Sequence, residues 1–425
     1  MNSLRRWLWP KSLGGKLVVV CGFSLFLVAG LWFAALLTTE RRLASAIVRC
    51  RELGYSGERR SPAPSVSEAL NGAIPFEQAC YLACVTIDEV SKQHFRAFDE
   101  RPKGVHAEEA RRLASNSDYE RLLKEADERV HFQSSIDAAI PSSILWLAVR
   151  DHLDDLVDVE TQMASDLAAA GDPTKAVDRL LRVLRLFRKR AANDSKMGFV
   201  PRYFSQRAVF EELNIILRER SLPGETHDRI ESELRTQDLF TGELWPALSQ
   251  RQFNDLIEQK KQSLLHTTFL LRPLANIDEG FAFERLELAL VARIMSYRES
   301  RKQPWETHPL AGLPFLKLEW HMDHGVQQAT TLARLSGATH RARVRSLRIL
   351  NAMARLKKFG ANLETLGLPP ECLVDPFDGR SMRIINDEQG LRIYSVGSNG
   401  QDDQGLIDRP NQYDVGFGPS KASKQ

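Results

Sequence analysis

The chain of 425 residues is long enough to form one large hydrophobic core or two ordinary ones, and with 43% hydrophobic and 27% charged residues it has the composition of a folded protein. Lys and Arg total 58 and Asp and Glu total 55, which gives a formal net charge of only +3. A nucleic-acid-binding domain carries a basic stripe or patch, and none stands out here. We therefore exclude nucleic acid as an expected partner.

An apolar stretch near the start is the strongest single signal. Residues 17–37, LVVVCGFSLFLVAGLWFAALL, contain no charged side chain, and a helix of that length spans roughly the 30 Å hydrocarbon core of a bilayer. A cleaved signal peptide has a shorter apolar region and a small-x-small cleavage site, whereas LLTTERRLA follows here. We predict a retained single-pass transmembrane anchor, preceded by a short tail over residues 1–16.

The charges that flank this stretch are nearly balanced. Four basic residues precede it and four follow it: Arg5, Arg6, Lys11 and Lys16, then Arg41, Arg42, Arg49 and Arg51. We favour a signal anchor in the cell inner membrane with its short tail in the cytoplasm, which would place the bulk of the chain in the periplasm.

Cysteine usage is compatible with that location. Cys21 lies in the apolar stretch, and the remaining four, Cys50, Cys80, Cys84 and Cys372, allow three complete pairings, which stay open. Cys80 and Cys84 share one helix face, but no nearby Cys or His completes a tetrahedral metal site. We expect both to be small buried thiols.

The middle of the chain is predicted to be helical. Residues 38–74 form a juxtamembrane region and linker that includes the Pro- and Ser-rich GERRSPAPSVS. From about residue 75 to 359 the apolar period is helical nearly throughout, and no useful alternating strand pattern occurs. The predicted class is therefore mainly α, with a helical domain over residues 75–337 built as a bundle or an array of helical hairpins.

One helical hairpin is clear, over residues 163–191. Gly171 ends the first helix, Asp172 caps the second, and Pro173 lies in its first turn. The pair is similar to one tetratricopeptide unit, but no 34-residue period continues on either side. We expect a helical-hairpin interaction surface. The buried arc of the second helix is predicted to consist of Val177, Leu180, Val183, Leu184 and Phe187.

The opposite half of that second helix carries an arginine at every third position: Arg179, Arg182, Arg185 and Arg188. A voltage sensor would need more membrane spans, and a phosphate site would need the guanidinium groups to converge. Because three-residue spacing moves successive side chains around the helix, we predict a solvated face with acidic neighbours.

No catalytic motif is found. His321 and His324 in EWHMDHG lie three apart and lack the HExxH pattern of zinc proteases, so we expect a polar helix end or loop there. A G-x-S-x-G elbow, a P-loop and a G-x-G-x-x-G after a strand are also missing. We therefore do not expect an enzyme.

The chain is predicted to end in a small α+β module over residues 338–418, followed by a disordered tail over 419–425. A helix of residues 338–359 carries an apolar face and is expected to end at Gly360. The strands SMRII and GLRIYSV, joined by NDEQ with Gly390 available for positive φ, predict a β-hairpin that packs on this helix.

The module resembles the end of type II secretion major pseudopilins. The matching residues are Asp375, Pro376, Phe377, Gly379, Tyr394, Ser395, Gly397, Gly400, Asp402 and Asp403. In that family the final loop binds calcium through oxygen ligands, so the resemblance implies a calcium loop with Asp402, Asp403 and Asp408 as ligands. Asn399 stands at a position that is commonly Asp in that family, so one possible acidic calcium ligand is missing.

The resemblance does not extend to a pseudopilin N-terminus. Gly22 lies inside the apolar run, and Leu27 stands where a prepilin has Glu. The whole layout also resembles a set of uncharacterised bacterial membrane-anchored proteins with one N-terminal span, a helical middle and this same tail. That similarity implies an architecture rather than an activity.

The leading functional hypothesis is a membrane-anchored envelope interaction or scaffold protein, with the membrane and other envelope proteins as partners. An atypical pseudopilin-like component of a secretion or pilus-type assembly is the alternative. An enzyme with an unrecognised site is a further alternative. Calcium is the single cofactor that the residues suggest.

Overall fold

The computed structural model of the protein describes residues 13–52, 66–94, 105–132, 142–191, 199–239, 257, 276, 321–407 and 414–419. These residues are mainly helical, with a small antiparallel sheet near the C-terminus, which confirms the predicted fold class. The chain divides into two compact units: Met1–Arg59, Ser249–Val291 and Pro304–Thr330 form the first, and Arg60–Leu248, Ala292–Gln303 and Thr331–Gln425 the second.

The first unit contains helix α2, Leu13–Glu52, which is long and apolar enough to span a bilayer. It continues well beyond the predicted anchor of residues 17–37, because no Gly or Pro occurs between residues 31 and 52. Its apolar half is exposed on all sides, whereas the second half has one buried stripe, made of Leu36, Leu43, Ala46, Ile47 and Cys50. One continuous helix thus joins an apolar segment to an amphipathic one.

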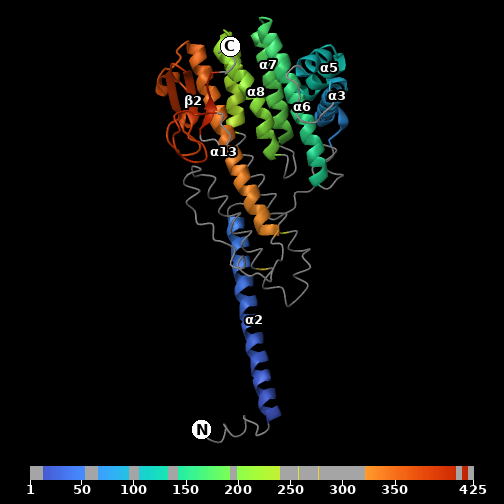
Figure 1. Ribbon diagram of the computed structural model, residues 1–425, viewed down its shortest axis with the longest axis vertical. Coiled ribbons are helices and arrows are strands. Elements are labelled where there is room, and N and C mark those ends of the chain that lie inside the picture. Colours follow the sequence, from blue (N-terminus) through green and yellow to red (C-terminus); the bar gives the residue numbers. More distant parts are fainter. Residues whose placement is uncertain are drawn as a thin grey trace. The chain divides into compact units, whose positions relative to one another are not determined.

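Most of the helices that the structure describes belong to the second unit (Figure 1). They are the 3₁₀ turn η1 Glu68–Leu70, α3 Ala73–His94, α4 Val105–Ala114, α5 Ser117–Glu128, α6 Ser142–Ala169, α7 Pro173–Ala191, α8 Phe199–Glu219, a helix over residues 224–239, and the later part of α13 His321–Leu356. Helix α6 packs against α3, α4, α7 and α8, and α5 packs mainly on α3. A continuous hydrophobic core runs from α3 through α8 to α13 and the sheet.

The α6–α7 hairpin forms as predicted. Gly171 adopts a φ of +90°, and the amide of Asp172 donates back to the carbonyl of Leu167 at 2.9 Å, which closes α6 in a Schellman-type end. The Asp172 carboxylate then accepts from the amide of Lys175 at 3.2 Å and caps α7, with Pro173 as its first residue. The predicted apolar arc of α7 is fully buried.

Helix α13 differs from the prediction at both ends. It begins at His321 rather than near residue 338, and it ends at Leu356 rather than at Phe359. Lys357, with a φ of +53°, takes the capping position expected of Gly360, and the amide of Lys358 donates to the carbonyl of Met353 at 3.0 Å. Gly360 lies in the next turn, where a Cβ would approach the Asn386 side chain to 2.8 Å.

Buried ionic contacts join α13 to the helix of residues 224–239. Arg348 is buried and donates to Glu231 at 2.6 Å and to Asp238 at 3.3 Å, and Arg345 donates to Asp238 at 3.2 Å. One turn along, His227 Nδ1 lies 2.7 Å from the side-chain oxygen of Asn351. These polar pairs align the two helices where the apolar period of α13 alone would permit other registers.

The predicted hairpin is present and has a third strand. Strands β1 Arg383–Asp387 and β2 Gly390–Ser395 pair antiparallel, with Gly390 at a φ of +97°. Strand β3, Val415–Phe417, pairs with β2 on its other side, so the sheet order is β1-β2-β3. Helix α8 holds this sheet, since Arg218 donates to the carbonyls of Leu391 at 3.0 Å and Phe417 at 3.4 Å.

Asp375 connects the DPFDG loop to the sheet. Its buried carboxylate accepts from the amide of Phe377 at 2.7 Å, the hydroxyl of Ser395 at 2.6 Å and the amide of Val396 at 3.0 Å. It also pairs with the guanidinium of Arg383. Several residues of the DPFDG…YS pattern thus have a structural role, because one carboxylate holds the loop against the end of β2.

We predict that Asp375→Asn will destabilise the module by about 3–5 kcal/mol, because it removes one partner of a buried ion pair and mismatches several donors. Asp387→Asn is the matched control, since Asp387 also pairs with an arginine of the sheet but is exposed, and it should cost at most about 1 kcal/mol. Hydrogen exchange across residues 391–396 at increasing urea measures both. Equal losses of unfolding free energy in the two variants would contradict the role of Asp375 in holding the DPFDG loop against β2.

Candidate functional site

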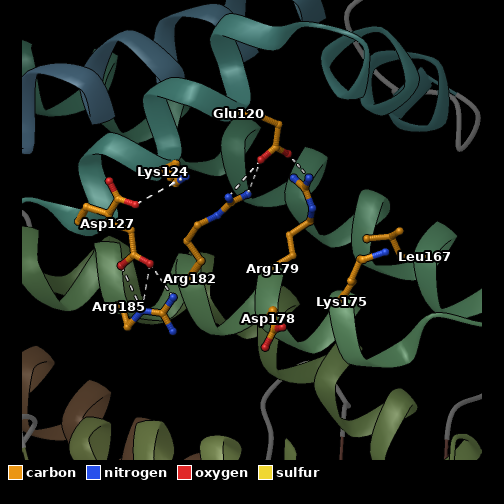
Figure 2. A pocket seen from close by; sticks show the side chains of 10 residues that line it. Glu120, Lys124, Asp127, Leu167, Lys175, Asp178, Arg179, Arg182 and Arg185 are labelled. Atoms are coloured by element: carbon orange, nitrogen blue, oxygen red, sulfur yellow. Dashed lines mark hydrogen bonds and ion pairs between the residues drawn. The ribbon is translucent and has the colours of Figure 1, made fainter.

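A groove of about 360 Å³ lies at the junction of α5, α6 and α7 (Figure 2). It is lined almost entirely by charged side chains. From α5 come Glu120, Lys124, Asp127 and Glu128, from α6 Leu167, and from α7 Lys175, Asp178, Arg179, Arg182 and Arg185. Several titratable groups from two helices face one another in this groove, so we take it as the candidate site.

The arginines of α7 do not form the solvated face that was predicted. The exposed fractions of the Arg179 and Arg182 side chains are only 14% and 17%. Each three-residue step turns the helix by about 60°, so the guanidinium groups leave α7 in different directions. Their long stems nevertheless bring them to carboxylates on other helices. The predicted acidic neighbours are present, but they come from α5, α6 and the helix of residues 224–239.

Glu120 bridges the first two arginines from α5. Its carboxylate accepts from Arg179 Nη2. It also accepts from Nη1 and Nη2 of Arg182, and these two distances are both 3.1 Å. Figure 2 shows both guanidinium groups pointing toward this one carboxylate. Partial burial opposes its ionisation, but the charges of Arg182 and Arg179 prevail and lower the pKa of Glu120 below its ordinary value.

Glu160 holds the same two arginines from α6, on the buried side. It has no exposed surface and accepts from Tyr119 Oη at 2.9 Å, Arg179 Nη1 at 2.6 Å and Arg182 Nη2 at 3.5 Å. Burial and the nearby Glu160 raise the pKa of Tyr119, so its hydroxyl stays protonated and donates. Side chains of α5, α6 and α7 therefore meet at one carboxylate.

Further along the groove, Asp127 pairs with α7 again. It accepts from Arg185 Nη2 at 2.6 Å and lies 3.8 Å from Lys189 Nζ. The rim is more exposed: Lys124 and Lys175 are each 73% exposed and make ion pairs on their own helices. The floor is thus held by interhelical pairs, and the rim carries exposed cations.

This arrangement can bind, orient and exchange charged groups. Its arginine side chains offer only N–H donors, so they can donate hydrogen bonds but cannot act as general bases. Among the described residues, no group of three or more His, Cys, Asp or Glu side chains is arranged to hold a metal ion.

The predicted calcium ligands Asp402 and Asp403 lie in the loop after β2. Asp402 Oδ1 accepts from Tyr394 Oη and from the amide of Gln404, both at 2.9 Å. Asp403 Oδ2 accepts from the side chain of Asn399 at 2.8 Å. Asp408 lies outside the described residues. The two described carboxylates therefore have internal partners, and calcium binding stays a prediction.

Sequence reasoning missed Asp414, which completes this loop. It is buried before β3 and accepts from the amide of Gly405 at 2.8 Å and that of Asp403 at 3.4 Å. Burial, with the charges of Asp402 and Asp403, raises its pKa to about 6. It follows Asp403 by 11 residues and precedes a strand that the sequence pattern did not predict, so no local signal identified it.

The remaining candidates are not part of the groove. Cys80 and Cys372 are buried, and burial raises the pKa of each thiol to about 12, as expected for inert core cysteines. Cys84 is half-buried. The side chains of His321 and His324 lie outside the described part of the structure.

Comparison of the chain with protein-family models, curated proteins and solved structures finds no match. The resemblance of the C-terminal module to major pseudopilins, and of the layout to uncharacterised membrane-anchored proteins, therefore stays a prediction.

We predict that Glu160→Ala will destabilise the second unit by about 3–5 kcal/mol, because it leaves Tyr119, Arg179 and Arg182 short of a buried acceptor. Glu211→Ala, which removes an exposed pair four residues from Arg207, should change stability by about 0.5 kcal/mol or less. Urea unfolding of the detergent-solubilised chain measures both. A loss of under 1 kcal/mol for Glu160→Ala would contradict this role.

We further predict that the C-terminal loop becomes more stable as pH falls from about 7 to about 4. Because the folded pKa of Asp414 is raised, the folded state binds a proton more tightly than the unfolded chain in that window. The gain should be about 1–3 kcal/mol and should level off below the ordinary carboxyl pKa. Asp414→Asn should reduce it, as measured by the pH dependence of hydrogen exchange at the amides of Asp403 and Gly405, which donate to Asp414.

The same loop tests the calcium prediction. A bound cation would favour the ionised carboxylates, so excess calcium at neutral pH should raise the melting temperature relative to chelator and oppose the proton-linked gain. Equal melting temperatures in calcium and chelator would reject calcium binding.

Proposed function

We propose that this chain is a membrane-anchored interaction or scaffold protein of the cell envelope, whose helical unit binds a partner protein in the groove of α5, α6 and α7. The observation that carries the proposal is the groove itself. It presents three ordered arginines and two exposed lysines in one hollow, on a chain with one apolar helix suited to a bilayer.

The local chemistry supports binding over catalysis. The titratable groups of the groove are arginines, lysines and carboxylates held in ion pairs, and ordered guanidinium groups serve recognition of anionic groups. An open hollow with paired charges at its floor and exposed charges at its rim resembles the polar rim of a protein–protein interface.

We place the anchor in the cell inner membrane with the helical unit in the periplasm. The basic residues before the apolar stretch support a cytoplasmic tail. The partner is then expected among other envelope proteins.

Photo-crosslinking in intact cells tests the proposal. A benzoylphenylalanine in place of Lys124, at the rim of the groove, should yield a crosslinked partner in the membrane fraction. Arg121 is the matched control position, because it lies on the same helix, is 56% exposed and does not line the groove. Lys175 provides an independent position across the groove on α7.

The expected result is one shared adduct from positions 124 and 175 that position 121 does not give. Equal adducts from all three positions, or none from the two rim positions, would contradict binding in the groove. Glu160→Ala should weaken the adduct, since it disorders the arginines of the floor.

A further inference from the structure

The groove already holds a carboxylate where a ligand would bind. We propose that Glu120 is an internal occupant of a carboxylate-binding position formed by Arg179 and Arg182, and that an acidic segment of a partner protein replaces it. This inference rests on the proposed function, because it names the chemistry of the groove's partner.

The carboxylate position is defined by two guanidinium groups. Arg182 donates to Glu120 Oε2 from both Nη atoms at 3.1 Å, and Arg179 Nη2 donates to Oε1. Two arginines on one carboxylate make a charge-assisted arrangement that fits any carboxylate of the same geometry. The site therefore selects a chemical group rather than the glutamate of α5 in particular.

The arginines keep their place without Glu120. Glu160 holds both from the buried side and is itself fixed by Tyr119. Preorganised donors of this kind lose little conformational freedom when a ligand arrives.

Glu120 is the carboxylate that can leave. The exposed fraction of its side chain is 35%, against 0% for Glu160 and 18% for Asp127. Helix α5 is held in the core by a separate apolar face, which consists of Tyr119, Leu122, Leu123 and Ala126. Only the side chain of Glu120 has to turn toward solvent, and the incoming carboxylate leaves no guanidinium unpaired.

Charge along α7 extends the site beyond one carboxylate. Lys175, Arg179, Arg182 and Arg185 all line the groove beside the acidic Asp127, Glu128 and Asp178, and the ten steps from the first cation to the last rise by about 15 Å. An extended peptide covers that length with about five residues and presents alternate side chains to one face. An acidic segment of about five residues therefore matches the length over which these cations are spread.

One donor of Arg182 is still unused. Its Nε is buried and makes no hydrogen bond, although both Nη atoms do.

Competition by Glu120 gives the inference a distinctive test. An internal carboxylate acts at an effective concentration of the order of millimolar, so its removal should tighten the binding of an acidic peptide. We would measure fluorescence anisotropy of labelled hexaglutamate on the full chain in phosphatidylcholine nanodiscs. Glu120→Gln should tighten binding about tenfold, and Arg182→Gln should weaken it about tenfold or more.

The matched control is Arg121→Gln, which removes a cation of α5 outside the groove and should leave binding unchanged. Labelled hexalysine should not bind. If Arg182→Gln lowers the melting temperature strongly, Arg185→Gln serves in its place, because Arg185 is more exposed and its loss still removes a cation of the groove.

Opposite effects of the glutamate and arginine variants support the inference, since a purely structural role would weaken binding in both. No tightening by Glu120→Gln, binding of hexalysine, or no binding of hexaglutamate to any variant overturns it. If crosslinks from positions 124 and 175 persist in that case, the acidic occupant is wrong and the groove still binds a partner. If hexaglutamate does not bind and the crosslinks from positions 124 and 175 are also absent, the proposed function is rejected as well.

Discussion

Glu160, a carboxylate with no exposed surface, constrains how α5, α6 and α7 pack together. Burying an ion costs several kcal/mol unless opposite charges and hydrogen-bond donors reach it with good geometry. Glu160 of α6 meets that condition only when Tyr119 of α5 and Arg179 and Arg182 of α7 converge on it. Pairing this one carboxylate therefore restricts the relative positions of α5, α6 and α7. The groove is the space that the long arginine side chains leave between these helices.

The same solution recurs where other elements meet. Asp375 joins the DPFDG loop to the sheet through Arg383, and Asp238 joins the helix of residues 224–239 to α13 through Arg345 and Arg348. An apolar face tolerates small shifts of register, whereas a buried ion pair permits few arrangements. The hydrophobic core supplies most of the cohesion of this unit, and the ion pairs select its arrangement.

The parts of the fold that depend on local sequence were predictable. The apolar half of α2, the turn at Gly171 and the hairpin of β1 and β2 are set by short-range patterns, and each was predicted from them. The arginine face of α7 was predicted wrongly because its partners lie on α5 and α6, which a one-helix reading cannot place. Strand β3 and Asp414 escaped for a related reason, since three residues carry too little pattern and their partners are distant in sequence.

The unbroken course of α2 has a mechanical consequence. Without Gly or Pro between residues 31 and 52, the helix has no hinge where it would leave a bilayer, so its tilt is passed on undiminished. Residues 38–52 extend about 22 Å, and a tilt of about 20° would move their far end sideways by about 8 Å. The buried stripe at Leu43, Ile47 and Cys50 would move and turn with it. Bilayer thickness influences that tilt, so a change in thickness would change the position of the buried stripe within the first unit.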